Sequence, residues 1–185
     1  MPTAETLLSI DLPLSSAGTP LPHVFADEGK LLVAYLINRP DPSFDGTNPR
    51  SVSAVTSNQS VAILTADPYL AFQFGPPSDE AISGHRLYEL GLRPYEAFEV
   101  LNSSWIASLG NANRIHSSHR PELFSEYRHF ILTFHDSTLE FIAESFSCSF
   151  HVGAILTTLM EAVGHRAQVH HVKPVRFIDR LWRRR

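Results

Sequence analysis

The chain has 185 residues, of which 43% are hydrophobic and 18% are charged, and its net charge is −4. This length and apolar content suffice for one core of ordinary domain size and exclude a disordered composition. No apolar run reaches the roughly 18 residues that span a bilayer, and the first residues lack the basic start and continuous apolar stretch of a secretory signal. We therefore expect a cytoplasmic protein, in line with its single cysteine, Cys148.

Charge is distributed unevenly along the chain. Residues 165–185 carry seven Lys or Arg against one Asp, a net of +6, whereas the preceding residues carry a net of −10. From Pro174 onward, apolar and basic residues recur at helical spacing, as in a helix that meets an acidic partner, a membrane or the protein's own core. The negative chain has no aromatic RNA-binding signature, which does not favour nucleic acid. We expect a flexible arm over 1–20, one globular domain over 21–173 and a basic tail or short helix over 174–185.

The first half of the chain predicts paired strands. Residues 21–39 read as two strands joined by a turn near Gly29, because apolar stretches flank a polar, glycine-containing break. Residues 40–50 contain three prolines and predict a loop. Residues 60–66 and 69–75 predict a second pair of strands.

Shorter elements follow in the sequence. Ser78 is expected to cap one or two helical turns, and residues 95–101 read as another strand. The next segment predicts a short helix capped by Asn102 or Ser103. A further turn of helix is expected with Pro121 near its start.

Residues 151–166 predict the clearest helix of the chain. Its apolar stripe is formed by Val152, Ile155, Leu156, Leu159 and Val163, with Gly164 at its end. Six or seven strands before one substantial helix, without regular alternation, predict an α+β fold. We expect a mainly antiparallel sheet with a few short helices and one longer amphipathic helix near the C-terminus; a β-sandwich or barrel with added helices is the alternative.

Residues 128–144 predict a β-hairpin with one apolar and one polar face, because polar and apolar residues alternate on both sides of a break. If Asp136 and Ser137 form a two-residue turn, His135 opposes Thr138. The polar row then comprises His129, Thr133, His135, Glu140 and Glu144.

This polar row has two interpretations. As a site, His135 acts as proton carrier or ligand and Glu140 as its carboxylate partner, so these two are the candidate catalytic residues, with His129 and Glu144 as binding residues. Imidazole and carboxylate within reach of each other also bind divalent metals, which leaves a metal cofactor open. As a surface, the row is the solvated face of a sheet with cross-strand pairs of modest strength.

A second group of histidines lies in segments expected to be loops. These candidate binding residues are His85, His116 and His119, with Arg120 beside the last of them. If the loops fold over the polar face of the hairpin, they complete a pocket of His, Glu and Arg side chains. An acidic small molecule would suit the arginines of such a pocket.

Motifs of the common enzyme classes are absent from the sequence: there is no GxSxG, GxxxxGK[ST], GxGxxG or HExxH. Two functional hypotheses therefore remain. One is a small-ligand-binding protein or small enzyme that uses the His/Glu face of the hairpin. The other is a non-catalytic module that binds a protein partner, or self-associates, through the basic tail or an exposed sheet edge.

Overall fold

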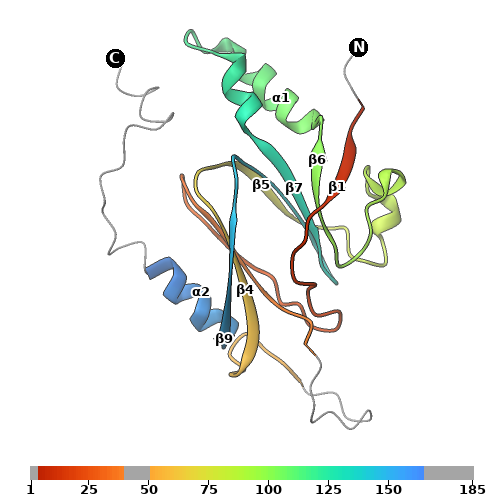
Figure 1. The fold of residues 1–185 in the computed structure, drawn as a ribbon, viewed down its shortest axis with the longest axis vertical. Helices are drawn as coiled ribbons and strands as arrows, with labels where there is room; N and C mark the ends of the chain where they lie inside the picture. The colour runs from red at the N-terminus through yellow and green to blue at the C-terminus, as the bar shows by residue number, and fades with distance from the viewer. Residues whose placement is uncertain (1–3, 40–50, 165–185) are drawn as a thin grey trace.

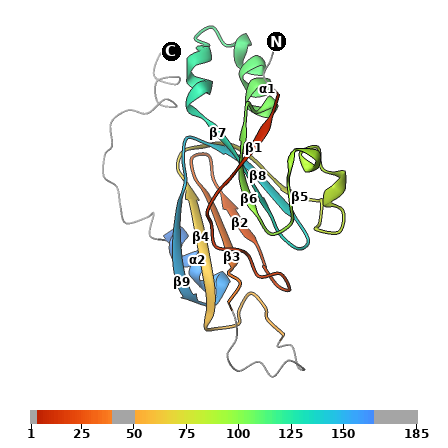
Figure 2. The same cartoon turned by 45° about the vertical axis from the view of Figure 1, so that its right-hand side comes forward.

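The computed structural model describes residues 4–39 and 51–164, which form two antiparallel β-sheets with a few short helices around them (Figures 1 and 2). The loop expected over 40–50 and the tail expected over 174–185 lie outside the described residues. Among the described residues, no helix is long and apolar enough to cross a membrane.

A five-stranded sheet has the strand order β1-β6-β7-β8-β5. Its strands are β1 (Thr6–Ser9), β5 (Tyr69–Gly75), β6 (Ala97–Leu101), β7 (Arg128–Thr133) and β8 (Thr138–Ala143). Strand β1 lies in the segment expected as a flexible arm, but it pairs with β6, and Leu7 packs against the apolar cluster on the outer face of this sheet.

A four-stranded sheet has the order β2-β3-β4-β9. Its strands are β2 (His23–Ala26), β3 (Leu31–Leu36), β4 (Gln59–Ala66) and β9 (Ser147–Gly153). Every residue of β3 is buried, because the five-stranded sheet covers one of its faces and a helix covers the other.

The two sheets share one apolar core. Phe130 and Phe141 of the five-stranded sheet pack against each other and against Phe146, while Tyr35 of β3 meets Phe134 with ring centroids 5.5 Å apart. Both sheets keep free edge strands, so the barrel alternative is wrong. The predicted mainly antiparallel architecture with short helices is confirmed, in the form of two packed sheets.

Helix α2 (Ile155–Gly164) covers the outer face of the four-stranded sheet with Ile155 and Leu159 (Figure 1). The prediction placed the start of this helix too early, because β9 continues through Val152, which pairs with β4. Leu156, expected on the buried stripe, is 41% exposed.

Helix α1 (Ser104–Ala112) lies at one end of the five-stranded sheet, and the side chain of Ser103 caps it by accepting from the Ile106 N–H. The other helical turns are η1 (Ile82–Gly84), η2 (Tyr88–Leu90), η3 (Asn113–Ile115) and η4 (Pro121–Glu126). The predicted Ser103 cap and the helical turn from Pro121 are confirmed. The predicted Ser78 cap is wrong, because η1 starts later and has no side-chain cap.

The segment from residue 76 to residue 95, which contains η1 and η2, packs over the outer face of the five-stranded sheet. Its side chains Ile82, Leu87 and Leu92 are buried against β6 and against Ile131 of β7. This segment, called the cover segment below, determines which polar groups of the hairpin reach solvent.

Candidate functional site

The predicted hairpin forms, but its turn and pairing differ from the prediction. The Phe134 N–H donates to the Ser137 carbonyl, so His135 and Asp136 occupy the centre of the turn. The pairing is thereby shifted by two residues: Thr133 faces Thr138, and His129 faces Ile142. A shift by an even number leaves every side chain on its predicted face.

Most of the polar row is buried rather than solvated. His129 is 0% exposed and Glu140 is 3% exposed, because the cover segment and α1 lie over this face. His135 is half-exposed at the turn, and Glu144 is exposed just beyond β8. The row therefore separates into a buried group around Glu140 and a half-exposed group around His135.

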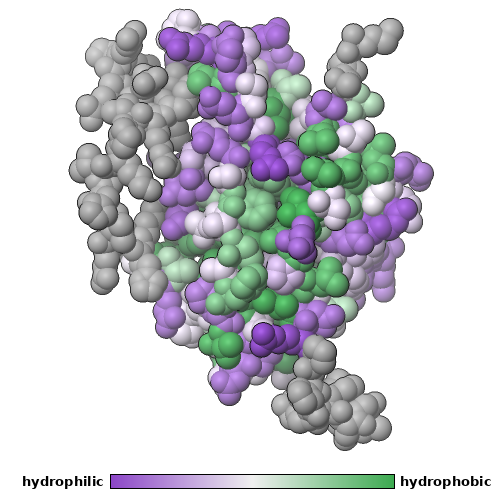
Figure 3. All heavy atoms as spheres, viewed as in Figure 1, coloured by the Kyte–Doolittle hydropathy of each residue, from purple (hydrophilic) through white to green (hydrophobic). Residues whose placement is uncertain are grey.

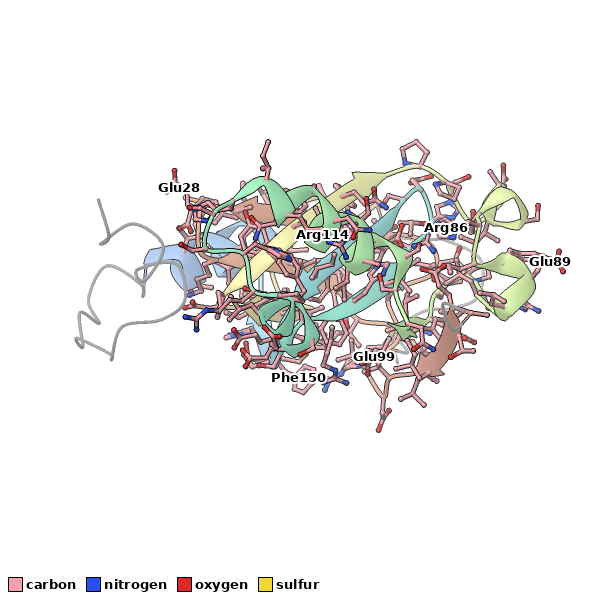
Figure 4. The ribbon with its side chains drawn as sticks, turned by 90° about the horizontal axis from the view of Figure 1, so that it is seen from above. Glu28, Arg86, Glu89, Glu99, Arg114 and Phe150 are labelled. Atoms are coloured by element: carbon pink, nitrogen blue, oxygen red, sulfur yellow. The ribbon has the colours of Figure 1, made fainter. Side chains whose placement is uncertain are left out.

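Glu140 is the centre of the buried group. One carboxylate oxygen accepts from Gln73 of β5 and lies 3.4 Å from His85 Nε2, while the other accepts from Arg86 at 2.8 Å and lies 2.9 Å from His129 Nε2. His85 and Arg86 come from the cover segment, on which Figure 4 shows Arg86 lying toward the body of the molecule and Glu89 projecting outward. Four side chains from three elements thus converge on one buried carboxylate.

His129 links Glu140 to the start of α1. Its Nδ1 lies 2.8 Å from the Ser103 hydroxyl, and the Trp105 ring meets its imidazole edge to face. Since Ser103 accepts from the helix N–H, its own proton is left to donate to Nδ1. This arrangement makes Nε2 the protonated nitrogen, which faces Glu140 in a close polar contact of 2.9 Å rather than a well-aligned hydrogen bond.

These contacts decide the ionisation of Glu140. Burial by itself raises a carboxyl pKa, but His129, His85 and the Arg86 charge outweigh burial and hold the pKa of Glu140 well below its usual range. An ionised carboxylate already contacted by four donors is a poor proton carrier. Glu140 is therefore suited to holding its neighbours in position.

His135 has a different carboxylate partner from the one expected. Its Nδ1 lies 2.9 Å from Asp79 Oδ2, which also accepts from the Tyr95 hydroxyl. The Asp79 backbone N–H donates to the His135 carbonyl, which fixes the cover segment to the turn. The predicted pairing of His135 with Glu140 is replaced by a cluster of Asp79, Tyr95 and His135.

The Asp79 carboxylate raises the pKa of both of its partners, His135 and Tyr95. Hydrogen bonding to Asp79 and the charge of that carboxylate raise the pKa of His135, and burial together with the same carboxylate raises the pKa of Tyr95 to about 12. Hydrogen bonds from Tyr95 and His135 lower the pKa of Asp79. An imidazole held at Nδ1 by a carboxylate, with no described partner at Nε2, has the geometry of a proton carrier.

The remaining candidate residues lie apart from both groups. His116 is exposed after η3, and its Nδ1 accepts from the Ser118 N–H. Arg120 is exposed before η4. The His119 ring lies tilted beside the Phe124 ring of η4, with ring centroids 6.0 Å apart, and lines a cavity beside α1. Of the four loop candidates, His85 therefore lies against the polar face of the hairpin, whereas His116, His119 and Arg120 lie elsewhere.

The cavity beside α1, called the α1 cavity, has a volume of about 620 Å³. Its lining includes Glu99, Ser103, Ile106, Arg114, His119, Phe124, Tyr127 and Arg128. It lies between α1, η4 and the start of β7. Figure 4 shows Arg114 beside α1 and Glu99 on the lower side of that view.

A smaller cavity of about 200 Å³ lies against the buried group and is lined by Gln73, His85, Thr138 and Glu140, among others. The described residues contain no group of three or more His, Cys, Asp or Glu side chains placed to hold a metal ion.

Sequence reasoning missed Gln73, Arg86, Tyr95 and the pairing role of Asp79. Arg86 directly follows His85, and Asp79 lies six residues before it, so both residues are close in sequence to a predicted site residue. Gln73 sits in a strand that was predicted, but its position opposite Glu140 depends on which strands pair.

Comparisons with protein-family models, curated proteins and solved structures found no match for this chain.

Replacing Glu140 by glutamine removes the buried charge and keeps the side-chain size. We expect Glu140→Gln to lower the free energy of unfolding by about 2 kcal/mol at neutral pH, because the hydrogen bonds that Gln73 and Arg86 donate to a charged carboxylate are weakened. The pKa of Glu140 is lower in the folded chain than in the unfolded chain, where it is about 4.3. The parent therefore has the full stabilisation above that pH and loses it as the pH falls.

Denaturant unfolding at a series of pH values between about 7 and 3 measures this effect. The parent should lose more stability on acidification than Glu140→Gln. Glu144→Gln, at an exposed position, is the matched control and should follow the parent. Equal acid dependence of the parent and Glu140→Gln would contradict the buried ion pair.

The Asp79 carboxylate should control the titration of His135. In Asp79→Asn, we expect the pKa of His135 to fall toward the ordinary value of about 6.5, because the hydrogen bond to a charged acceptor and the attractive charge are both removed. Nuclear magnetic resonance titration of the His135 ring protons measures the change. Glu80→Gln, a neighbouring carboxylate without that hydrogen bond, is the control and should shift His135 less; an unchanged pKa in Asp79→Asn would refute the assignment.

Proposed function

We propose that this protein binds a small acidic molecule with an apolar part in the α1 cavity. The observation that carries the proposal is the convergence of Arg114, Arg128 and His119 around an apolar wall formed by Ile106 and Phe124. Ligand sites in proteins are typically concave and apolar with a few polar groups that orient the ligand. Arginine is also the residue best suited to carboxylate and phosphate groups.

The cationic groups differ in how far they are already engaged. Arg128 pairs with Glu99 of β6 through Nε and one terminal nitrogen, and its guanidinium lies over the Phe130 ring. Arg114 has no ion-pair partner among the described residues. Arg114 is therefore the charge available to a ligand. Arg128 is already held by Glu99 and has one terminal guanidinium nitrogen left to donate.

The apolar wall packs against Gly110 of α1. A Cβ atom added at Gly110 would make an ordinary van der Waals contact of 3.4 Å with the Phe124 ring, so η4 lies directly against this turn of the helix. Phe124 in turn lies beside the tilted His119 ring, whose Nδ1 lies 3.2 Å from the Asn113 amide. These contacts fix the imidazole at the rim of the α1 cavity.

In this proposal, the His/Glu face of the hairpin holds the start of α1, and thereby one wall of the α1 cavity, in position. His129 bonds the Ser103 hydroxyl, and Ser103 both caps α1 and lines the α1 cavity. Glu140 holds His129, so the buried group orients the helix that forms one wall. We assign His129 and Glu140 as positioning residues for the ligand site.

The binding test uses an aromatic carboxylate and its uncharged amide isostere as probes, measured by calorimetry on the full chain. We expect the carboxylate to bind more tightly than the amide, and Arg114→Gln to weaken its binding by about tenfold, which corresponds to roughly 1.4 kcal/mol. Arg120→Gln, a neighbouring exposed arginine outside the cavity lining, is the matched control and should bind as the parent does. Equal binding of carboxylate and amide, or equal loss in both variants, would overturn the proposal.

A second candidate function is self-association through β9. This strand is an edge of its sheet, and Phe150 and Val152 are 61% and 71% exposed. Figure 3 shows hydrophobic side chains gathered at the centre of one face, and Figure 4 shows Phe150 projecting on the same side of the molecule as Glu99. Residues 147–153 contain no charged residue and no proline, which are the usual protections of an edge strand.

An antiparallel pair of β9 strands centred on Phe150 would bring Cys148 opposite Val152 and Ser149 opposite His151, without any repulsion between like charges. We expect Phe150→Lys to abolish such a dimer, as measured by sedimentation velocity over a range of concentrations. Phe74→Lys, on the edge strand β5 of the other sheet, is the control. A parent that stays monomeric at every concentration, or a dimer that survives Phe150→Lys, would exclude this contact.

A further inference from the structure

A second cavity lies where the chain leaves β1 and passes over the open end of the core. It has a volume of about 430 Å³. One wall is the segment from Ser9 to Ser15, and the opposite wall contains Tyr35, Leu132 and Phe134. Because neither Arg114 nor Arg128 lines it, this cavity is separate from the α1 cavity.

The lining of this cavity is acidic. Asp11 and Glu96 contribute two exposed carboxylates, and no Lys, Arg or His lines it among the described residues. Neither carboxylate has a hydrogen-bond or ion-pair partner within the described part of the chain. The lining of this cavity therefore contains two negative charges without a partner among the described residues.

A buried hydroxyl without a partner lies in the same lining. Ser15 is 6% exposed, and its Oγ has no hydrogen bond among the described residues. The other deep hydroxyls are satisfied, since Tyr35 donates to the Pro13 carbonyl and Thr133 donates to the Arg93 carbonyl. A buried hydroxyl without a partner is costly, so it marks a position where a ligand can supply the missing bond.

We propose that this cavity binds a small organic cation, an amine with an apolar stem, with its ammonium group between Asp11 and Glu96. The partly exposed side chains of Leu12, Leu14 and Tyr95 supply apolar surface for the stem, since Tyr35 and Phe134 deeper in the lining are buried. An ammonium N–H or a hydroxyl on the ligand would bond to Ser15.

The test titrates the full chain with phenethylamine and with its neutral isostere, 2-phenylethanol, and follows backbone amide shifts of the Ser9–Ser15 segment together with calorimetry. We expect the amine to bind with a dissociation constant at or below about 1 mM and at least tenfold more tightly than the alcohol. Binding should weaken as salt is added, because the contacts are partly exposed. Equal binding of amine and alcohol, or no binding of the amine, would overturn the proposal.

Variants locate the binding. Asp11→Asn combined with Glu96→Gln should weaken amine binding at least tenfold, whereas Glu28→Gln combined with Glu89→Gln should leave it unchanged. The control pair removes the same net charge at positions that Figure 4 shows near the two ends of the molecule, away from the cavity. If both pairs weaken binding equally, the amine responds only to net charge and the site is refuted.

Ser15→Ala gives a readout that a purely structural serine would not. We expect the variant to unfold at the same or a slightly higher denaturant concentration than the parent, because a hydroxyl without a partner is removed. The same variant should bind the amine several-fold more weakly. Loss of stability with unchanged amine binding would show that the hydroxyl serves the fold, and this outcome would contradict its proposed role.

Discussion

The arrangement of the molecule depends on one ionised carboxylate beneath the cover segment. A buried charge is tolerated only when several donors surround it, and the donors to Glu140 come from β5, β7 and the cover segment. Arg86 also bonds Glu5, whose other oxygen accepts from the first turn of α1. Two carboxylates joined by Arg86 thus hold these parts together: Glu140 binds β5, β7 and the cover segment, and Glu5 binds the cover segment to the N-terminal segment and the helix. None of these parts can move away without leaving a charge unpaired.

The alternation of the hairpin allowed its two faces to be assigned from the sequence, but not what covers them. Side chains keep their faces under an even shift of register, so His129 and Glu140 were placed on the same side although their predicted partners were wrong. Whether that side meets water depends on a segment more than thirty residues earlier, whose buried Ile82 and Leu87 follow no regular period. The pairing of His135 with Asp79 depends on the same packing and has no local signal.

The misassigned elements have a common physical cause. Strand β1 has only four residues, and its hydrogen bonds go to β6, far along the chain, so local composition gave no reason to expect it. Near the C-terminal end of the described residues, the segment of His151 and Val152 is compatible with either a helix or a strand. It forms a strand because both residues pair with β4. Short apolar segments are ambiguous between helix and strand until a neighbouring strand is present.

Strand β6 relates the two cavities to each other. Glu96, just before the strand, and Ala97 at its start line the acidic cavity, whereas Glu99 to Leu101 at its end line the α1 cavity with its arginines. Glu96 and Glu99 are three strand positions apart, about 10 Å, which exceeds the Debye length of about 8 Å at physiological ionic strength. Charges at the two openings are therefore largely screened from each other. A ligand at one end of β6 should act on the other end only through movement of the strand, which the β1 and β7 pairings on both of its sides resist.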